Sequence, residues 1–113
     1  MSDVHAYLRF LPISAQKVRL VIDVIRGKDA NQAMDILRFL PNRAALPVRK
    51  LLASAIANAE ENFGVSRDDL VVATITADEA PTRKWRRFGA RGRFKPILRR
   101  NSHVTVVLRE RGA

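Results

Sequence analysis

The sequence contains no cysteine among its 113 residues. Disulfides, thiolate nucleophiles, cysteine zinc sites and iron–sulfur clusters are therefore excluded together. Its apolar runs are at most five residues long, far short of the stretch that a membrane-spanning helix needs. Asp3 and Arg9 interrupt the first residues, which therefore lack the basic-then-apolar order of a secretion signal. These absences favour a soluble, intracellular protein.

Histidine is also scarce, with His5 and His103 alone, and neither has a second ligand type at metal-binding spacing. Two acidic pairs, Glu60–Glu61 and Asp68–Asp69, are the best candidates for a Mg²⁺ site, and a nuclease using Asp68 and Asp69 is one alternative. We expect these pairs instead to solubilise a helix end and a turn. No serine lies in a nucleophile elbow, and the segment Gly89–Gly92 lacks the Lys-Ser/Thr of a phosphate-binding loop. The sequence thus predicts no enzyme, no cofactor and no metal.

Positive charge is abundant and unevenly placed. Lys and Arg number 21 against 11 acidic residues, for a net charge of +10. The window Ala80–Arg109 holds ten of the basic residues and no carboxylate, while the rest of the chain balances eleven of each sign. Trp85, Phe88 and Phe94 lie in the same window. Arginine binds phosphates with a planar fork and aromatic rings stack on bases, so this mixture favours a nucleic-acid contact over a merely solvated face.

The first third of the chain predicts two helices. Ser14–Arg26 carries apolar residues at three- and four-residue spacing, with Ser14 as N-cap and Gly27 as the stop. A shorter helix follows, opened by a capping box at Asp29–Gln32 and ended by Pro41. The faces predicted to be buried are Val18, Val21, Ile22 and Ile25, then Ala33, Ile36, Leu37 and Leu40.

A third helix is predicted to begin near Pro47, run to about Asn62 and end at Gly64. Its inner face comprises Val48, Leu51, Leu52, Ala55, Ile56 and Ala59. Segments rich in β-branched residues predict strands. They are Val4–Phe10, Leu70–Ala77 and Ser102–Leu108.

The order of strand, three helices and two strands predicts a two-layer α+β domain over residues 1–113, with helices on one face of a small sheet. The 22 residues from Ala80 to Asn101 join the last two strands and contain the basic block. If both strands continue outward, they form a protruding β-hairpin about 35 Å long. Its turn is predicted within Gly89–Arg93, where two glycines occur.

Five blocks of this sequence resemble a known family, in order and at the family's spacing. The first is Ser14–Val21 followed by Ile25–Lys28, and the other four are Ser54–Glu60, Asp78–Pro81, Ala90–Arg93 and Ser102–Val107. The family is that of the bacterial large-subunit ribosomal protein numbered L-twenty-two. The resemblance covers most of the chain, from about Ser14 to Leu108.

The resemblance implies a structural protein of the 50S subunit that binds 23S rRNA and assists subunit assembly. Its globular part would sit on the outer surface, and its hairpin would pass through the rRNA to line the nascent-peptide exit tunnel. Partners would be other large-subunit proteins, including the extension of ribosomal protein L-four at the tunnel, and transiently the nascent peptide. No membrane is implied, and the expected location is the ribosome in the cytoplasm.

Some positions depart from the family's pattern. Pro12 stands before the first helix where arginine is frequent, so a phosphate contact from that position is not expected. Ala80 replaces the glycine of a Glu-Gly-Pro turn. Phe88–Gly89 and Phe94–Pro96 also differ from the commoner residues, which predicts a bulkier and differently charged hairpin tip.

The residues expected to bind rRNA lie in the basic block, at the start of the last strand and on the first helix. They are Arg83, Lys84, Trp85, Arg86, Arg87, Phe88, Arg91, Arg93, Lys95, Arg99, Arg100, Ser102, His103, Lys17, Arg19, Arg26 and Lys28. The tip expected to line the tunnel is Phe88, Gly89, Ala90, Arg91, Gly92 and Arg93. Trp85 could instead pack on the end of the sheet. The chief alternative is an architectural DNA-binding protein with a basic β-arm.

Overall fold

The computed structural model describes the backbone of residues 3–88 and 94–112, and the side chains of residues 3–81 and 100–112. Its elements follow the predicted order of one strand, three helices and two strands. They are β1 (Val4–Leu11), α1 (Ala15–Ile25), α2 (Ala30–Phe39), α3 (Ala45–Phe63), a short 3₁₀ turn η1 (Arg67–Asp69), β2 (Leu70–Phe88) and β3 (Phe94–Glu110). The prediction of an α+β fold is confirmed.

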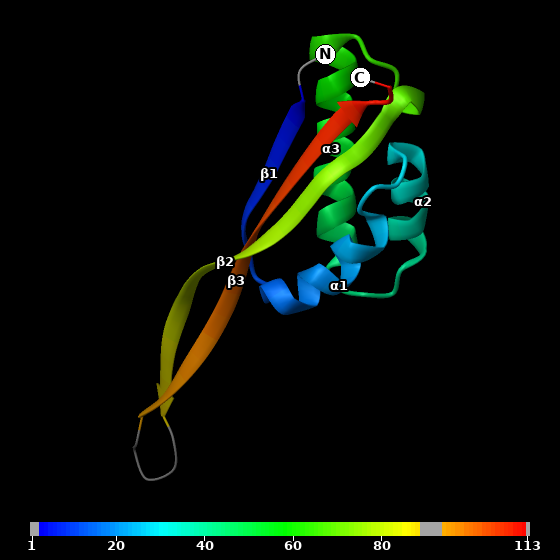
Figure 1. Cartoon of the computed structure of the whole chain (residues 1–113). Coiled ribbons are helices and arrows are strands. Elements are labelled where there is room, and N and C mark those ends of the chain that lie inside the picture. The colour runs from blue at the N-terminus through cyan, green and yellow to red at the C-terminus, as the bar shows by residue number, and fades with distance from the viewer. Residues whose placement is uncertain (1–2, 89–93, 113) are drawn as a thin grey trace.

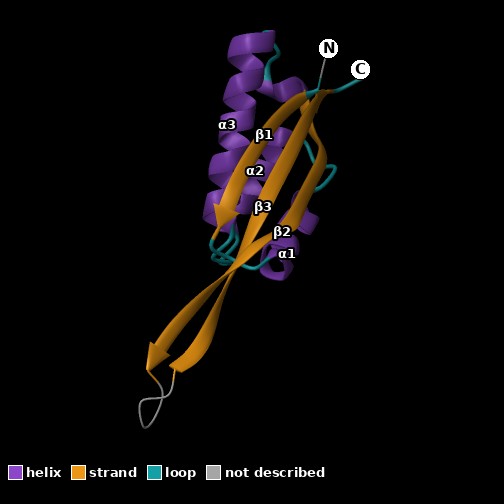
Figure 2. Ribbon diagram, turned by 90° about the vertical axis from the view of Figure 1, so that its left-hand side faces the viewer, coloured by secondary structure: helices purple, strands orange, loops and turns teal. Residues whose placement is uncertain are grey.

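The three strands form one antiparallel sheet in the order β1-β3-β2, so the last strand is the central one. All three helices lie on one face of this sheet, and its other face is left open (Figures 1 and 2). Alternation along β3 directs Val104, Val106 and Leu108 into the core. Val72 and Ile75 of β2 also point there, on either side of a register shift between Val72 and Thr74, and all five are fully buried. The molecule is therefore a two-layer domain.

Helix α1 forms as its sequence predicts. The Ser14 side chain accepts a hydrogen bond from the Lys17 amide, and the predicted apolar face is buried. Gly27 ends the helix at φ 78°, a backbone conformation that glycine adopts without a Cβ clash. Its amide then donates to the Val72 carbonyl, so the same residue begins the contact between the helix layer and β2.

The predicted capping box of α2 is wrong. Asp29 occupies the N-cap position, but its side chain makes no capping hydrogen bond. Its carboxylate instead pairs with Arg111 at 2.8 Å, and its backbone bridges to Val71. A full positive charge within reach outcompetes a backbone amide for the carboxylate. Spacing along the chain could not reveal a partner that lies 82 positions away.

Helix α3 begins at Ala45, two residues before the predicted start, and it places Pro47 in its first turn. Proline is tolerated there because those amides have no intrahelical acceptor. The predicted inner face of α3 is buried, and Gly64 ends the helix at φ 66°. Both features confirm the sequence-based prediction.

β1 contains an irregularity between Leu8 and Leu11, where its register on β3 shifts. Phe10 lies at this point with φ 55°, the left-handed conformation that non-glycine residues rarely adopt. Its amide donates to Nδ1 of His103 at 3.0 Å, and the two rings meet edge to face. His103 therefore supplies the hydrogen bond that the interrupted ladder does not.

β2 and β3 continue well beyond the domain as one antiparallel ladder, paired as far as Phe88 opposite Phe94. The long axis of the molecule measures 63 Å, against 25 and 18 Å for the other two. Figure 1 shows the hairpin leaving the domain at a narrow point, near the pairing of Ala80 with Asn101, which we call the waist. The prediction of a long protruding hairpin is confirmed, whereas its predicted turn at 89–93 lies outside the described residues.

Candidate nucleic-acid interface

The basic block occupies the projecting part of β2 and β3, which we call the arm (residues 82–99). Its described backbone pairs with itself, from Arg83 opposite Arg99 to Phe88 opposite Phe94. The register also sets Arg87 opposite Lys95. Of the tip predicted to line the tunnel, residues 89–93 lie outside the described part of the chain.

Two arginines of α1, predicted to contact rRNA, are hydrogen bonded to an edge of the sheet. Arg19 Nε donates to the Ala77 carbonyl at 3.0 Å. Arg26 donates to the Ile75 carbonyl from Nε and from its second terminal nitrogen, at 3.3 and 2.9 Å. Its remaining nitrogen pairs with Asp23 at 2.7 Å. Every nitrogen of the Arg26 guanidinium therefore has a partner within the domain. The hydrogen bond from Arg19 to β2 uses only its Nε.

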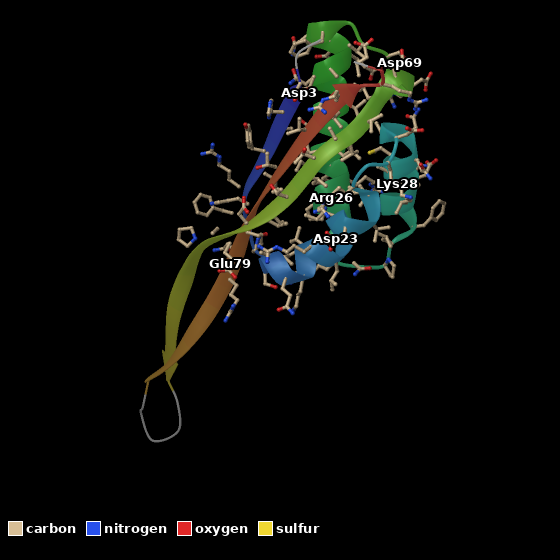
Figure 3. All side chains as sticks on the ribbon, viewed as in Figure 1. Asp3, Asp23, Arg26, Lys28, Asp69 and Glu79 are labelled. Carbon is tan, nitrogen blue, oxygen red and sulfur yellow. The ribbon has the colours of Figure 1, made fainter. Side chains whose placement is uncertain are left out.

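These bonds protect a strand edge. β2 lies at one side of the sheet, and its outer carbonyls would otherwise be open to pairing with another chain. Figure 3 shows Arg26 between α1 and β2, with Asp23 beside it. The sequence shows arginine spacing on a helix, but it does not show that the edge of β2 passes alongside.

The predicted cations of α1 lie at opposite ends of that helix. Lys17 is in the first turn, near the waist, and Lys28 follows the last turn. The eight helical steps from Lys17 to Ile25 alone span about 12 Å along the axis, and Lys28 lies three residues farther on. Figure 3 shows Lys28 beside α2, remote from Glu79 at the waist. The structure therefore brings Lys17, but not Lys28, to the root of the arm.

Two further predicted residues lie where β3 enters the domain. Ser102 is fully buried, and its hydroxyl has no hydrogen-bond partner among the described residues. His103 is partly exposed on the open face of the sheet and holds Phe10, as described above. Ser102 therefore lies on the core side of β3, and His103 lies on the open side.

A cavity of about 780 Å³ opens at the root of the arm, and it includes residues that the sequence did not single out. Besides Lys17 and Arg100 it is lined by Asn42 and Arg43 from the loop before α3, and by Asn101 of β3. A proline followed by polar residues between two helices predicts only an exposed loop. Its approach to the waist depends on how α2 and α3 pack, which no local pattern shows.

The two acidic pairs form protein contacts. Glu60 pairs with Arg67 at 3.0 Å, and the Asp68 carboxylate accepts from the Asn31 amide at 2.7 Å. Among the described residues no group of three or more His, Asp or Glu side chains could hold a metal ion. Within the same residues no helix is both long and apolar enough to cross a bilayer.

The chain is similar to known ribosomal proteins over nearly its whole length. The family model described as Ribosomal protein L22p/L17e matches residues 6–109. The large ribosomal subunit protein uL22 of Thermoanaerobacter sp. (strain X514) is 49% identical over 109 residues, which cover 96% of this chain and 98% of that protein. Its counterpart in Streptococcus pyogenes serotype M6 is 48% identical over 111 residues, or 98% and 97% of the two chains. A match of this extent, on a fold with the expected arm, leads to one conclusion: the chain belongs to the ribosomal protein L22p/L17e family.

Proposed function

We propose that this chain is a structural, non-enzymatic component of the large ribosomal subunit in the cytoplasm, and that it binds 23S rRNA chiefly through its arm. One observation carries this proposal. The arm carries eight basic residues and no acidic one, so it holds eight of the ten net positive charges, and its described backbone projects from a domain with a net charge of only +2. The names of the relatives, which are large-subunit proteins, support the same placement.

The arm would act by neutralising phosphates where rRNA helices crowd together. Its arginines and lysines would each displace counterions, so affinity would fall steeply as salt rises. Trp85 and Phe88 supply rings that can stack on unpaired bases. The register sets Arg83 opposite Arg99 and Arg87 opposite Lys95, so both strands of the arm would contribute to phosphate binding.

A second, weaker footprint would lie on the domain, at Lys17, Arg19, Arg100 and His103. Lys17 and Arg100 meet at the root of the arm, and Arg19 leaves its terminal amino groups for a phosphate. Lys28 would contribute separately, at the far end of α1. Arg26 and the buried Ser102 would act through the fold, by positioning β2 and β3.

The tip of the arm would line the nascent-peptide exit tunnel, next to the extension of ribosomal protein L-four. The growing peptide would then be a transient neighbour, and other large-subunit proteins would be permanent ones. An arm threaded between rRNA domains would also assist assembly, because it can join segments that fold separately. The resemblance to this family supports each of these assignments.

Sedimentation of a native lysate tests the proposal. The tagged chain should travel with the large subunit through a sucrose gradient, and should stay there after a high-salt wash. Release to the top at modest salt, or travel with nucleoid DNA, would contradict the ribosomal assignment and favour the DNA-binding alternative.

A pair of matched variants assigns the binding to the arm. Arg86→Gln with Arg87→Gln removes two charges from the arm, and Arg38→Gln with Arg49→Gln removes two from the helices. Only the arm pair should weaken binding to 23S rRNA, by about tenfold or more, and lower the slope of log K against log salt by about 1–2. Equal losses from both pairs would show that the arm is not the main contact.

A further inference from the structure

The cavity at the root of the arm is built from three segments far apart in the sequence. The start of α1 supplies Pro12–Lys17 with Leu20, the loop before α3 supplies Asn42–Ala44, and the arm's root supplies Glu79, Ala80, Arg100 and Asn101. Figure 3 shows Glu79 at the waist, close to where α1 begins. The volume of about 780 Å³ falls in the range of small-ligand sites, about 300–1,000 Å³.

The lining is positively charged without internal compensation. Lys17, Arg43 and Arg100 are all exposed, and none forms an ion pair with a described carboxylate. Five other arginines of the domain do form such pairs. Glu79 is the one carboxylate in the lining, so cations exceed it by two. Three cations against one carboxylate in the same lining favour an anionic ligand.

The walls are too varied for a simple anion site. Leu20 and Ala80 provide apolar surface, while Asn42 and Asn101 provide amides that both donate and accept. Asn101 is 8% exposed, and its Nδ2 donates to the Pro81 carbonyl at 3.4 Å, which fixes the side chain at the cavity wall. A phosphate alone needs neither apolar surface nor amides. A nucleotide uses cations, apolar surface and amides together, because its phosphate is accompanied by a planar base with a polar edge.

The helix end adds little to this attraction. The Ser14 hydroxyl already accepts from the Lys17 amide, so part of the first turn of α1 is satisfied within the chain. The three side-chain cations therefore supply the charge, and the amides supply the selectivity.

We propose that this cavity receives one unpaired nucleotide of RNA, with its phosphate held by Lys17, Arg43 and Arg100 and its base placed between apolar wall and asparagine amides. The inference rests on the proposed function and deepens it. The arm would bind rRNA through charge, and the cavity would read one nucleotide at a fixed point of the domain. Paired bases cannot enter, because their edges are already occupied and stacked.

Nuclear magnetic resonance on the full ¹⁵N-labelled chain tests this directly. Single-stranded hexauridylate and hexaadenylate should each be titrated, alongside a 12-base-pair RNA duplex and inorganic phosphate. The side-chain amide signals of Asn42 and Asn101 should shift with at least one single strand and not with the duplex. Shifts of equal size with inorganic phosphate would reduce the cavity to an anion site and overturn the proposal.

A matched pair of variants adds an affinity readout. Arg43→Ala removes a cation of the lining, and Arg38→Ala removes an exposed one outside it. Affinity for the single strand, followed at the Asn42 amide, should fall about threefold to tenfold in the first and less than twofold in the second. Equal effects in the two variants would also overturn the proposal.

The two proposals fail separately. If the full chain binds 23S rRNA while both asparagine amides stay unmoved by every single strand, the nucleotide site is wrong and the proposed function stands. If the chain does not bind 23S rRNA at all, the proposed function itself fails.

Discussion

The antiparallel ladder of β2 and β3 runs through two different environments in this molecule. Near the helices, from Leu70 to Ala80, β2 lies against α1 and α2 and buries Leu70, Val72, Ile75, Ala77 and Ala80. Beyond Pro81 the same two strands continue, but their backbones pair only with each other. The near half carries Asp78 and Glu79 among its residues, and the far half carries no carboxylate at all.

The difference shows that the same backbone pairing can belong to a folded core or to an exposed arm, depending on which side chains the strands carry. An isolated two-stranded hairpin is at best marginally stable in water, and it gains stability when one face is covered. The near half is covered by helices within the chain. The far half carries eight basic residues and no carboxylate, a composition that fits the polyanion contact proposed above.

Truncation in the near half should have the largest effect on stability. Ile75 is fully buried under the helices, so Ile75→Ala should lower the free energy of unfolding by about 2–4 kcal/mol. Urea denaturation measures this loss, and Thr76→Ala on the open face should cost less than about 0.5 kcal/mol. Similar losses from both variants would show that this half of the ladder is not stabilised by its helical cover.

The protected edge of β2 should contribute less. Arg26→Met keeps the aliphatic stem but removes the hydrogen bonds to the Ile75 carbonyl, which should cost about 1–2 kcal/mol. Lys28→Met removes a charge from the end of the same helix and should leave the urea midpoint nearly unchanged. If the two variants have the same urea midpoint, Arg26 is a surface charge and does not support the sheet.

Removal of the far half should change stability little. Replacement of residues 84–99 by an Asn-Gly turn deletes seven basic residues and leaves the described core complete. The free energy of unfolding should stay within about 1 kcal/mol, because the deleted backbone pairs only with itself. Circular dichroism at 222 nm and urea denaturation measure the result. Loss of the helical signal would mean that the domain depends on its arm.

The smallest effect should come from an ion pair on the near half. Two hydrogen bonds from Arg109, at 3.0 and 3.1 Å, hold the pKa of the Asp3 carboxyl below its ordinary value of 3.8. A lowered pKa in the folded state means that the charged form stabilises the fold above pH 3.8, and that this contribution is lost as pH falls toward the folded pKa. The carboxyl titration of Asp3, followed by nuclear magnetic resonance, should move back toward 3.8 in Arg109→Met. An unchanged titration would exclude Arg109 as the cause.

The order and extent of the elements could be predicted because their signals are local. Ser14, Gly27 and Gly64 act through the backbone next to them, and the apolar spacing of α3 defines its buried face without reference to other elements. The arm was predictable from charge and from the length of the segment between strands. Contacts between distant residues were not, as the Asp29–Arg111 pair in place of a capping box shows.

The candidate site divides in the same way. The sequence predicts a nucleic-acid contact at the basic block because a charge excess is a property of composition, and that assignment stays a prediction. Arg26 could not be recognised as a support of β2, and Arg43 could not be placed beside Lys17 and Arg100. Both depend on how the helix layer packs against the sheet, and sequence spacing on one helix does not contain that information.

The strand order also has a consequence for how the chain folds. In the described part of the chain β3 is the central strand, pairing with both β1 and β2, and it follows both of them in the sequence. Val4 pairs with Leu108, so more than a hundred residues must be synthesised after Val4 before this pair can form. Closing so long a loop slows folding, whereas α1 to α3 can form from local contacts as soon as they leave the ribosome. Synthesis should therefore yield a helical, sheetless chain first, and the sheet should assemble in one late step when β3 arrives.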